Sequence, residues 1–565
     1  MACAWVTHAQ TLPDAGSIQR DIERQQQVRP VAPPPAAAPA RPAAEPRPGE
    51  LQFQVRAFVL KGVNLVQEQD VQAVLRPWLG NAIQFSDLEL AKQAIVDLYQ
   101  RQGWVARPQI PEQELQDGGE LIIQVIEGRL GEVRIEQEPP KPEEARRFNR
   151  GRILKTFTAR QRAGEPLYMP HVERAVSLIN DTPGASASVT LATGEAPGAT
   201  DVVVTPVVRS LFSGTFTRDN TGSRSTGPVK DTLSLNVDSP EGWGDQTSIN
   251  IMRSEGVEYE RLAYSLPLGY DGLRLGINAS SMSYRVIFPM SEGNPSYPRG
   301  TAYTQGLSLT WPALRSANQN LYVQASWDHK HFVNEIFNPD TANVNPLSNK
   351  QLRVASLSVN ADRSDDWWGG GMTQWNLGMV NGQVDLSANA QNLQTDAQGP
   401  NTAGRYGKLS MGISRLQRLS GSTSLWASLQ GQRSNKNLDS SEKFTLGGSQ
   451  GVRAYPSAEG SGDHGHLLTL EARQALSAQW QGVLFYDFGS IKVNHEAYVG
   501  ANGPTQVDLQ GAGASVSFTW PGYAVARLTW SRRLGDNPLA HVKTGLDSDG
   551  SLVVNRVWLN LTAFF

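Results

Sequence analysis

Hydrophobic and polar residues alternate along the chain from Arg209 to Phe565. Apolar residues occupy every second position in stretches such as 273–280, 321–328, 425–429, 514–520 and 557–565. A period of two is typical of β-strands, whose successive side chains point to opposite faces of the sheet. The alternating stretches run for about ten residues, the length of a tilted membrane-spanning strand. Turn-rich runs at 220–228 and 292–300 separate them.

A single closed barrel fits this region better than a soluble sheet. Soluble antiparallel sheets also alternate, but about 350 residues without a helical pattern would hold about 16 membrane strands at roughly 22 residues per strand and connection. A closed barrel leaves no strand edge and satisfies every backbone group in lipid. Aromatic residues near predicted strand ends, Trp367, Trp368, Tyr523 and Trp558, are typical of the interfacial girdles of such barrels.

Two α/β units precede the predicted barrel, at residues 51–128 and 129–208. The first has the order β-α-α-β-β, with helices at 70–79 and 86–102 and a closing strand at 121–126. Ser86 and Glu89 form a capping-box pattern at the start of the second helix. The second unit repeats the order more loosely, with a strand near Val133, a helix near Val176 and strands that end at 201–204.

The N-terminal fifty residues predict three short segments. Residues 1–9 resemble the end of a secretory signal peptide, with a disordered N-terminus as the alternative. Residues 10–27 contain one short helix, in which Ile18 and Ile22 share a face. Residues 28–50 are rich in proline and form a semi-extended linker. A helix on a long linker has to dock elsewhere, or else it is part of a disordered tail.

Composition narrows the possible functions. The net charge is −3, so charge gives no reason to expect a nucleic-acid partner. Cys3 is the only cysteine, which excludes a disulfide framework and a thiolate metal site. Apolar runs fall short of the ~18 residues that a membrane helix requires. A lipid-facing strand needs only every second residue to be apolar, so a hydrophobic content of 39% is compatible with a barrel.

Two short motifs suggest chemistry but lack the required context. Gly447 to Gly451 match the G-x-S-x-G pattern of serine hydrolases, which needs a following helix where another strand is predicted here. Asp463, His464 and His466 could ligate a metal, but a solvated loop is the simpler interpretation. No nucleotide-binding loop is present in the sequence. We therefore expect no catalytic residue, cofactor or metal, and a protein that is not an enzyme.

An arginine and an aspartate form the most informative pattern. Arg453 follows Val452 in a glycine-rich loop and precedes Ala454 and Tyr455, while Asp487 lies within a strand that reads Phe-Tyr-Asp-Phe-Gly. A charge that faces the interior of a barrel needs a partner, and a bidentate arginine–carboxylate pair supplies one. For each residue alone, a surface charge is the commoner interpretation.

Together these residues resemble the POTRA-bearing outer-membrane barrel superfamily, and more closely its two-partner secretion transporter (TpsB) family. The resemblance implies that a V-R-G-Y/F loop folds into the lumen and that Arg453 at its tip, between Val452 and Tyr455, pairs with Asp487. It also implies that Phe485 and Gly489 belong to the receiving F-x-D-x-G strand. Ala454 departs from the family pattern, which has glycine there.

The resemblance covers nearly the whole chain. It implies a plug helix at 10–27 with Ile18 and Ile22, POTRA domains at 51–128 and 129–208, and a barrel at 209–565 whose loop around 447–465 folds into the lumen. Residues 219–227 resemble the first barrel hairpin, and Phe565 resembles the terminal assembly signal.

By this resemblance we expect a translocator in the bacterial outer membrane, with its POTRA domains in the periplasm. It would export, without ATP, one unfolded β-helical exoprotein, such as an adhesin, haemolysin or contact-dependent toxin. Recognition would use strand addition, near the second helix of the first unit and a sheet edge at 121–126. Barrel assembly machinery and periplasmic chaperones would assist biogenesis, and outer-membrane lipids would surround the barrel. The alternatives are an outer-membrane assembly factor (insertase), which usually has more POTRA units, and a porin, which needs none.

Overall fold

The computed structural model describes residues 13–27, 52–114, 119–136, 147, 149–288, 295–501, 503–541 and 544–565. The expected signal-peptide remnant at 1–9 and the linker at 28–50 lie outside the described residues. No helix within the described ranges is both long and apolar enough to cross a membrane.

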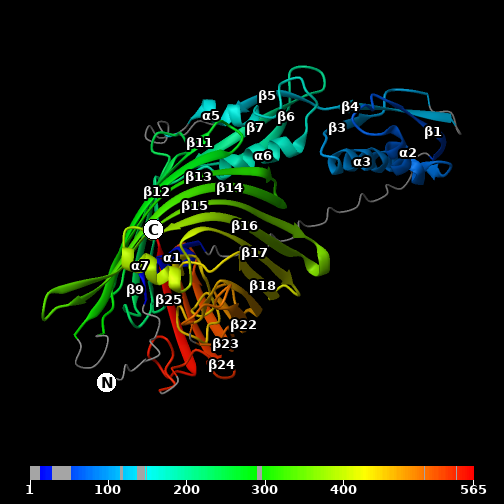
Figure 1. The fold of residues 1–565 in the computed structure, drawn as a ribbon. Coiled ribbons are helices and arrows are strands. Elements are labelled where there is room, and N and C mark those ends of the chain that lie inside the picture. Colours follow the sequence, from blue (N-terminus) through cyan, green and yellow to red (C-terminus); the bar gives the residue numbers. More distant parts are fainter. Residues whose placement is uncertain are drawn as a thin grey trace.

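Sixteen antiparallel strands form one closed barrel, which confirms the predicted fold class (Figure 1). Neighbours along the chain pair with one another, and the last strand closes the barrel on the first. The strands are β8 (Phe212–Asp219), β9 (Lys230–Asp238), β10 (Gln246–Arg253), β11 (Val257–Leu268), β12 (Leu273–Arg285), β13 (Tyr297–Arg315), β14 (Gln319–Asn338), β15 (Asn343–Asp365), β16 (Gly371–Asp385), β17 (Gly404–Arg418), β18 (Thr423–Ser434), β21 (His464–Ala475), β22 (Trp480–Lys492), β23 (Gln506–Trp520), β24 (Ala524–Arg533) and β25 (Asn555–Phe564).

The outer face of the barrel is an apolar band. On β15, Leu357 points outward and is 50% exposed, and its partners across the sheet are Ala325 of β14 and Met379 of β16. Similar exposed residues continue around the wall, among them Leu262, Ile277, Leu307, Leu377, Met411 and Leu470. A soluble monomer rarely exposes so large a continuous apolar surface. The period-two pattern therefore places this band against lipid.

Three of the four predicted girdle aromatics lie in turns at one end of the barrel. Trp367 and Trp368 form the short helix η2 (Trp367–Gly369) and are 59% and 74% exposed, and Tyr523 is 61% exposed. The fourth prediction was wrong, because Trp558 is only 8% exposed. It occupies the opposite face of β25 from Val557 and Leu559, so it points into the lumen.

The first α/β unit contains β1 (Phe53–Lys61), α2 (Glu68–Leu75), η1 (Arg76–Trp78), β2 (Ala82–Ile83), α3 (Phe85–Arg101), β3 (Ala106–Gln109) and β4 (Gly119–Glu127). Its sheet has the order β2-β1-β4-β3 around a core that includes Val55, Leu88, Ile95 and Ile123. The short strand β2 was not predicted. The α3 capping box is formed by Gln84 and Asp87 rather than by Ser86 and Glu89. The predicted sheet edge at 121–126 was also wrong, because β3 pairs with residues 124–127 of β4 and the Gln113 side chain bonds the backbone of Ile122.

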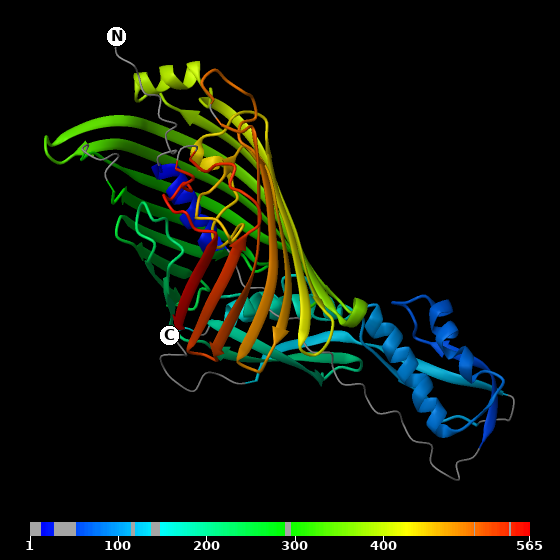
Figure 2. The same ribbon diagram turned by 90° about the horizontal axis from the view of Figure 1, so that it is seen from below.

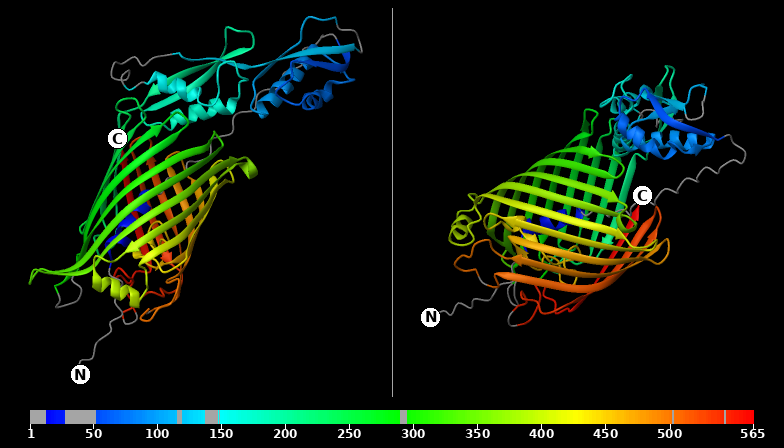
Figure 3. Two further views of the ribbon diagram at one scale, coloured as in Figure 1. Left: turned by 45° about the horizontal axis from the view of Figure 1, so that its top comes forward. Right: turned by 90° about the vertical axis from the view of Figure 1, so that its right-hand side faces the viewer.

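The second α/β unit contains β5 (Arg129–Ile135), α5 (Arg150–Phe157), α6 (Met169–Asn180), β6 (Ala185–Thr193) and β7 (Ala199–Val208). Its sheet has the order β5-β7-β6, so β5 and β6 are its edges. Figure 3 shows this unit across one end of the barrel, with the first unit beyond it.

Arginine side chains attach the second unit to the turns at that end. Arg160 and Arg174 both bind Asp271 in the β11–β12 turn, at 2.7 and 2.9 Å. Arg315 of β13 binds Asp181 of the second unit through two hydrogen bonds of 2.6 and 2.8 Å. Burial alone would raise the pKa of Asp271, but the hydrogen bonds from both arginines outweigh it and hold the pKa below its usual value. The second unit is therefore fixed to the barrel by charge-assisted hydrogen bonds.

Candidate functional site

Two elements occupy the lumen of the barrel, the helix α1 (Ala15–Gln27) and the segment 435–463 between β18 and β21. We call this segment the inner loop. It contains η3 (Ser440–Glu442) and the strand pair β19 (Phe444–Thr445) and β20 (Ser461–Gly462). Figure 2 shows α1, in blue, crossing the interior beside the inner loop.

The first part of the inner loop is held by lysines of the barrel wall. Lys330 of β14 and Lys408 of β17 bind the Glu442 carboxylate at 3.1 and 2.7 Å. Lys350 of β15 binds Asp439 at 2.7 Å. Glu442 is only 3% exposed and Asp439 only 7%. Burial of these charges is compensated only while the loop lies against the wall.

The tip of the inner loop is held by Arg453. Its Nε and Nη2 donate hydrogen bonds to the two oxygens of Asp487, each at 2.8 Å. Its Nη1 donates to Glu471 of β21 at 2.8 Å, and its guanidinium lies 3.5 Å from the centre of the Phe485 ring. The Asp487 side chain is fully buried. The bidentate geometry and the second carboxylate make this a charge-assisted network in a region shielded from water.

Apolar packing fixes the rest of the tip. Val452 and Tyr455 are fully buried, in a cluster with Leu446, Leu467, Ile491, Val507 and Leu509. A side chain at Gly489 would come within 2.7 Å of Leu446 and 3.2 Å of Val452, so glycine there lets the loop approach the wall. Ala454 packs against Gly511 of β23, where an added Cβ would lie 2.6 Å from the alanine methyl group. The absence of a side chain at Gly511 therefore accommodates the departure at Ala454.

Three residues that contact Arg453 were not identified from the sequence. Glu471 is its second carboxylate, while Ser531 Oγ and Trp558 Nε1 donate hydrogen bonds to its backbone carbonyl at 2.7 and 2.8 Å. All three occupy inward positions of their strands. The alternation could have placed Trp558 in the lumen, but nothing in the sequence indicated which loop it would meet.

Asp463 and His464 close the base of the inner loop, and the prediction of a solvated loop there was wrong. Asp463 is fully buried and accepts hydrogen bonds from the backbone amides of Leu438 and His495. His464 begins strand β21, and its Nε2 lies 2.9 Å from Nδ1 of His495. His466 is 6.0 Å from the ring of Phe488. The described residues contain no cluster of three potential metal ligands.

The G-x-S-x-G pattern at Gly447 to Gly451 lies in a series of turns in the inner loop, and no helix follows it. The strand–turn–helix context of a nucleophile elbow is therefore missing in this part of the structure.

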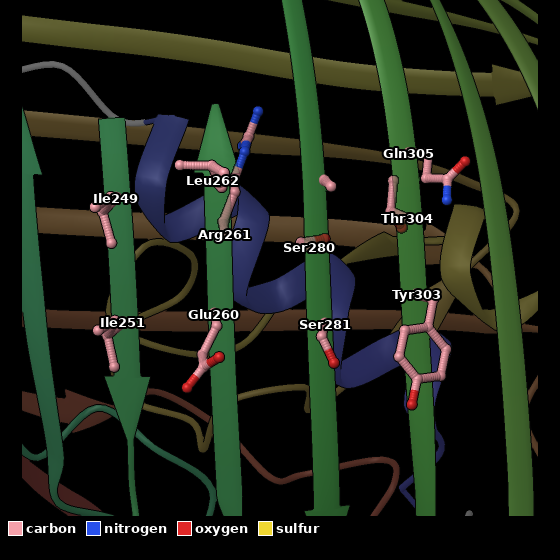
Figure 4. Close-up of a pocket in the computed structure, with 11 residues that line it drawn as sticks. Ile249, Ile251, Glu260, Arg261, Leu262, Ser280, Ser281, Tyr303, Thr304 and Gln305 are labelled. Atoms are coloured by element: carbon pink, nitrogen blue, oxygen red, sulfur yellow. The ribbon is translucent and has the colours of Figure 1, made fainter. Parts of the chain in front are cut away.

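Helix α1 packs an apolar face against the barrel wall. Ile22 is 8% exposed and Ile18 is partly buried, both against a cluster that includes Tyr259, Met282, Phe332, Leu352 and Tyr406. Gln19 donates hydrogen bonds to Thr304 at 2.7 Å and to Ser280 at 3.4 Å. Figure 4 shows the helix behind the strands that bear these two residues. The sequence singled out the isoleucines but not Gln19.

The helix also binds the inner loop through two arginines. Arg20 donates to the carbonyls of Ser440 and Lys443 at 2.6 and 3.1 Å. Arg24 donates to the carbonyl and hydroxyl of Thr445 at 3.0 and 2.8 Å. Helix and loop therefore fill the lumen as one connected block.

The C-terminus lies at the end of the barrel that the second unit covers (Figure 3). Phe565 exchanges two backbone hydrogen bonds with Gly214 near the β8–β25 seam, at 2.8 and 3.1 Å. Its ring covers Gly214 and is 63% exposed overall.

Comparison with known families gives two matches. A profile described as haemolysin secretion/activation protein ShlB/FhaC/HecB matches residues 198–518. A profile described as ShlB-type POTRA domain matches residues 53–128. The first covers most of the barrel and the second covers the first α/β unit.

Individual relatives are distant but nearly full-length. The chain is 25% identical over 550 residues to the heme/hemopexin transporter protein HuxB of Haemophilus influenzae strain 86-028NP, which covers 93% of this chain and 92% of the relative. It is 26% identical over 421 residues to the outer membrane transporter CdiB of Dickeya dadantii strain 3937, with 73% and 71% covered.

Solved structures share the fold. CdiB from Escherichia coli superposes with a TM-score of 0.69 at 20% identity, covering 97% of this chain and 98% of that one. BamA from Haemophilus ducreyi lacking POTRA domains 1–3 gives a TM-score of 0.54 at 13% identity, with 91% and 100% covered.

Proposed function

Because the chain belongs to the haemolysin secretion/activation (ShlB/FhaC/HecB) family, we propose that it exports one large, β-helix-forming exoprotein as the transporter of a two-partner secretion system. The family and the fold expected from the sequence are confirmed. The barrel lies in the outer membrane, and the first α/β unit lies in the periplasm.

The observation that supports transport is the filling of the lumen. A passive pore needs an open lumen, but here α1 and the inner loop occupy the interior, held by hydrogen bonds and ion pairs and by apolar packing against the wall. Among the described residues, no backbone–backbone hydrogen bond joins α1 to a barrel strand, so α1 can leave the lumen without unfolding one. We propose that α1 is a plug helix and that its departure opens the pore.

Arg453 and Asp487 have a different role in this proposal. Their network links the tip of the inner loop to the barrel wall, so they hold the conducting scaffold in place and react with no substrate. Val452, Tyr455, Phe485 and Gly489 support the same docked position. We propose that the docked tip is required for transport, and that Phe565, beside the seam, is the signal for barrel assembly.

Recognition of the unfolded exoprotein is proposed to use a sheet edge in the periplasm. An interior strand such as β4 cannot accept a further strand. The nine-residue strand β6 (Ala185–Thr193) is an edge strand of the second unit, and its Leu191 is 43% exposed. The Asn180 side chain caps its backbone at Ala187, and no other described strand pairs with its outer side. Main-chain hydrogen bonds to β6 would give affinity, and neighbouring side chains would give selectivity. The folding of the exoprotein outside the cell would supply the direction of transport.

The test compares culture medium and outer membranes from cells with and without this protein by mass spectrometry. We expect one very large secreted protein to disappear while the levels of other barrels stay constant. A joint fall of many outer-membrane proteins would instead identify an insertase and overturn the proposal.

The edge at β6 needs its own variant. Val189→Pro removes a backbone donor within β6, and Val189 is only half-buried, so the second unit should keep its fold. Because an edge strand also pairs inward with β7, Leu191→Asp is the matched variant that leaves the backbone intact. We expect both to reduce capture of the exoprotein, and normal secretion by both would place recognition elsewhere.

A further inference from the structure

Strands β15 and β17 each present two outward-facing arginines that are ten residues apart. They are Arg353 and Arg363 on β15, and Arg405 and Arg415 on β17. The outward positions between the members of each pair are apolar or glycine, namely Ala355, Leu357, Val359 and Ala361, and Gly407, Leu409, Met411 and Ile413. Ten residues of a strand tilted by about 40° rise roughly 25 Å, the height of the apolar band of such a barrel. Each strand therefore places one arginine at each membrane boundary.

The arginines at the periplasmic boundary include one that already has a protein partner. Arg415 makes two hydrogen bonds to Asp365, of 2.8 and 2.9 Å, and lies 5.2 Å from the centre of the Trp367 ring. This end of the barrel is the one that the second α/β unit covers. The charge of Arg415 is therefore compensated within the protein.

The two arginines at the outer boundary differ in this respect. Arg353 and Arg405 are exposed, and neither forms an ion pair or hydrogen bond with the part of the chain that the structure describes. Gln383 of β16 lies between them, directly opposite both residues in the sheet. At the usual spacing of neighbouring strands the two arginine Cα atoms are about 10 Å apart.

The surroundings of these arginines favour an anion. His329 of β14 lies directly opposite Arg353 and stacks on the Trp327 ring. Asp385, two residues beyond Gln383, is the nearest acidic side chain on β16, and its carboxylate accepts a hydrogen bond from the backbone amide of Ser387. The charge of Arg353 also acts on this carboxylate. Two positive charges therefore lie above the apolar band with one negative charge near them.

We propose that Arg353, Gln383 and Arg405 bind the phosphorylated glucosamine headgroup of the lipopolysaccharide in the outer leaflet. A guanidinium binds phosphate oxygens through two parallel hydrogen bonds, and the glutamine amide can bond a sugar hydroxyl between them. The apolar residues directly below would contact the acyl chains. A soluble anion would make no contact with these apolar residues. The site faces lipid, lies outside the lumen and goes beyond the proposed transport function.

The test measures lipid binding by the full-length protein in detergent, with native mass spectrometry as the readout. The probes are bis-phosphorylated lipid A, the same lipid without phosphates, phosphatidylglycerol and inorganic phosphate. The variants are Arg353→Gln and Arg405→Gln, alone and together. Arg363→Gln is the matched control, because it removes the same charge from the same strand at the opposite boundary.

We expect wild-type protein and the Arg363→Gln control to bind lipid A equally well. Each outer-boundary substitution should weaken binding about fivefold, which is about 1 kcal/mol for one arginine near a membrane surface. Removal of the lipid phosphates should abolish the difference between the variants. Heat-modified mobility on gels verifies that each variant is a folded barrel.

Several results would overturn the proposal. Unchanged lipid A binding by the double variant, or equal weakening by Arg363→Gln, would show that these arginines do not form the site. Equal binding of phosphatidylglycerol would indicate a general anionic-lipid surface, and saturation by inorganic phosphate alone would indicate an ion site. If the double variant does not assemble, the single variants and the comparison of phosphorylated with dephosphorylated lipid on wild-type protein decide the question.

Discussion

Replacement of Arg453 by alanine should leave the barrel assembled but stop secretion. The substitution removes the bidentate contact with Asp487, the contact with Glu471 and the packing on Phe485. It keeps the hydrogen bonds from Ser531 and Trp558, since these go to the backbone carbonyl of residue 453. The loop tip would therefore lose its charged side-chain attachment and retain its apolar packing and its backbone hydrogen bonds, including the one from the amide of residue 453 to Asp487.

The size of this loss follows from burial. Asp487 is fully buried and Glu471 is 10% exposed, so both carboxylates would remain in the wall, and Glu471 alone would keep a cation, Arg473. Removal of one partner from a buried pair costs about 3–5 kcal/mol. A cost of about 3 kcal/mol shifts the equilibrium between docked and undocked tip by more than a hundredfold. The sixteen-strand hydrogen-bond network is untouched, so barrel assembly should persist.

The assay combines secretion with limited proteolysis of the inner loop in isolated outer membranes. We expect Arg453→Ala to show normal heat-modified mobility, faster cleavage of the loop and no secreted exoprotein. Secretion by Arg453→Lys should be intermediate, because a lysine keeps the charge but cannot form two parallel hydrogen bonds to Asp487. Arg473→Ala is the control, since Arg473 binds the shared Glu471 and lies 5.0 Å from the centre of the Trp426 ring of the wall, and its side chain is 20% exposed. Normal secretion by a well-assembled Arg453→Ala protein would refute the reasoning.

Three further changes have expected outcomes. Arg20→Ala combined with Arg24→Ala removes the hydrogen bonds between α1 and the inner loop, worth about 1 kcal/mol or more each. The double variant should raise the open probability of the channel in planar bilayers, and an unchanged open probability would show that these bonds do not hold α1 in the lumen. Glu127 in the first unit accepts hydrogen bonds from the amides of Asn64 and Leu65 and from the Tyr99 hydroxyl. Burial would raise the pKa of Glu127, but these bonds outweigh it and the pKa lies below its usual value. The stability that these hydrogen bonds give the first unit is therefore complete above the pKa of glutamate in the unfolded chain, about 4.3. It is lost as the pH falls through the lower pKa of Glu127 in the folded unit. Glu127→Gln should remove about 2 kcal/mol and this acid dependence, read as hydrogen exchange of the first unit in the full chain; an unaltered pH profile would contradict it. Asp271→Asn should loosen the second unit from the barrel, seen as a broader spin-label distance distribution between α6 and the β13–β14 turn. An unchanged distribution would contradict a role of the Arg160 and Arg174 contacts with Asp271 in fixing this unit.

Local periodicity predicted the barrel because each lipid-facing position has to be apolar wherever its strand lies. The same reasoning placed Ile18 and Ile22 on one face of a helix. Prediction from local periodicity failed where the position of a side chain depends on a contact with a residue distant in the sequence. Trp558 was assigned to a girdle because it is aromatic and near a strand end, although its parity within β25 places it opposite Leu559 and therefore inside. Its partner is the carbonyl of Arg453, 105 residues away.

The remaining errors have the same origin. Whether strand 121–126 was an edge depended on β3, which pairs on its outer side and is too short to stand out in the sequence. Asp463 looked solvated because its neighbours are polar, but this buried carboxylate is stabilised by two backbone amides and by Lys443 at 3.1 Å. Lys330, Lys350 and Lys408 occupy ordinary polar positions of their strands, and only the folded loop gives them partners.

Those three lysines also determine which ions an emptied lumen would prefer. While α1 and the inner loop are in place, the three lysines face three carboxylates, because Asp14, directly before α1, lies 3.5 Å from Lys350 beside Asp439 and Glu442. Departure of α1 together with Asp14 would leave one positive charge of the wall uncompensated. If the loop left as well, three ammonium groups would line the conduit without their carboxylates, and permeation would shift towards chloride. A reversal potential measured under a salt gradient would therefore report how many elements move when the channel conducts.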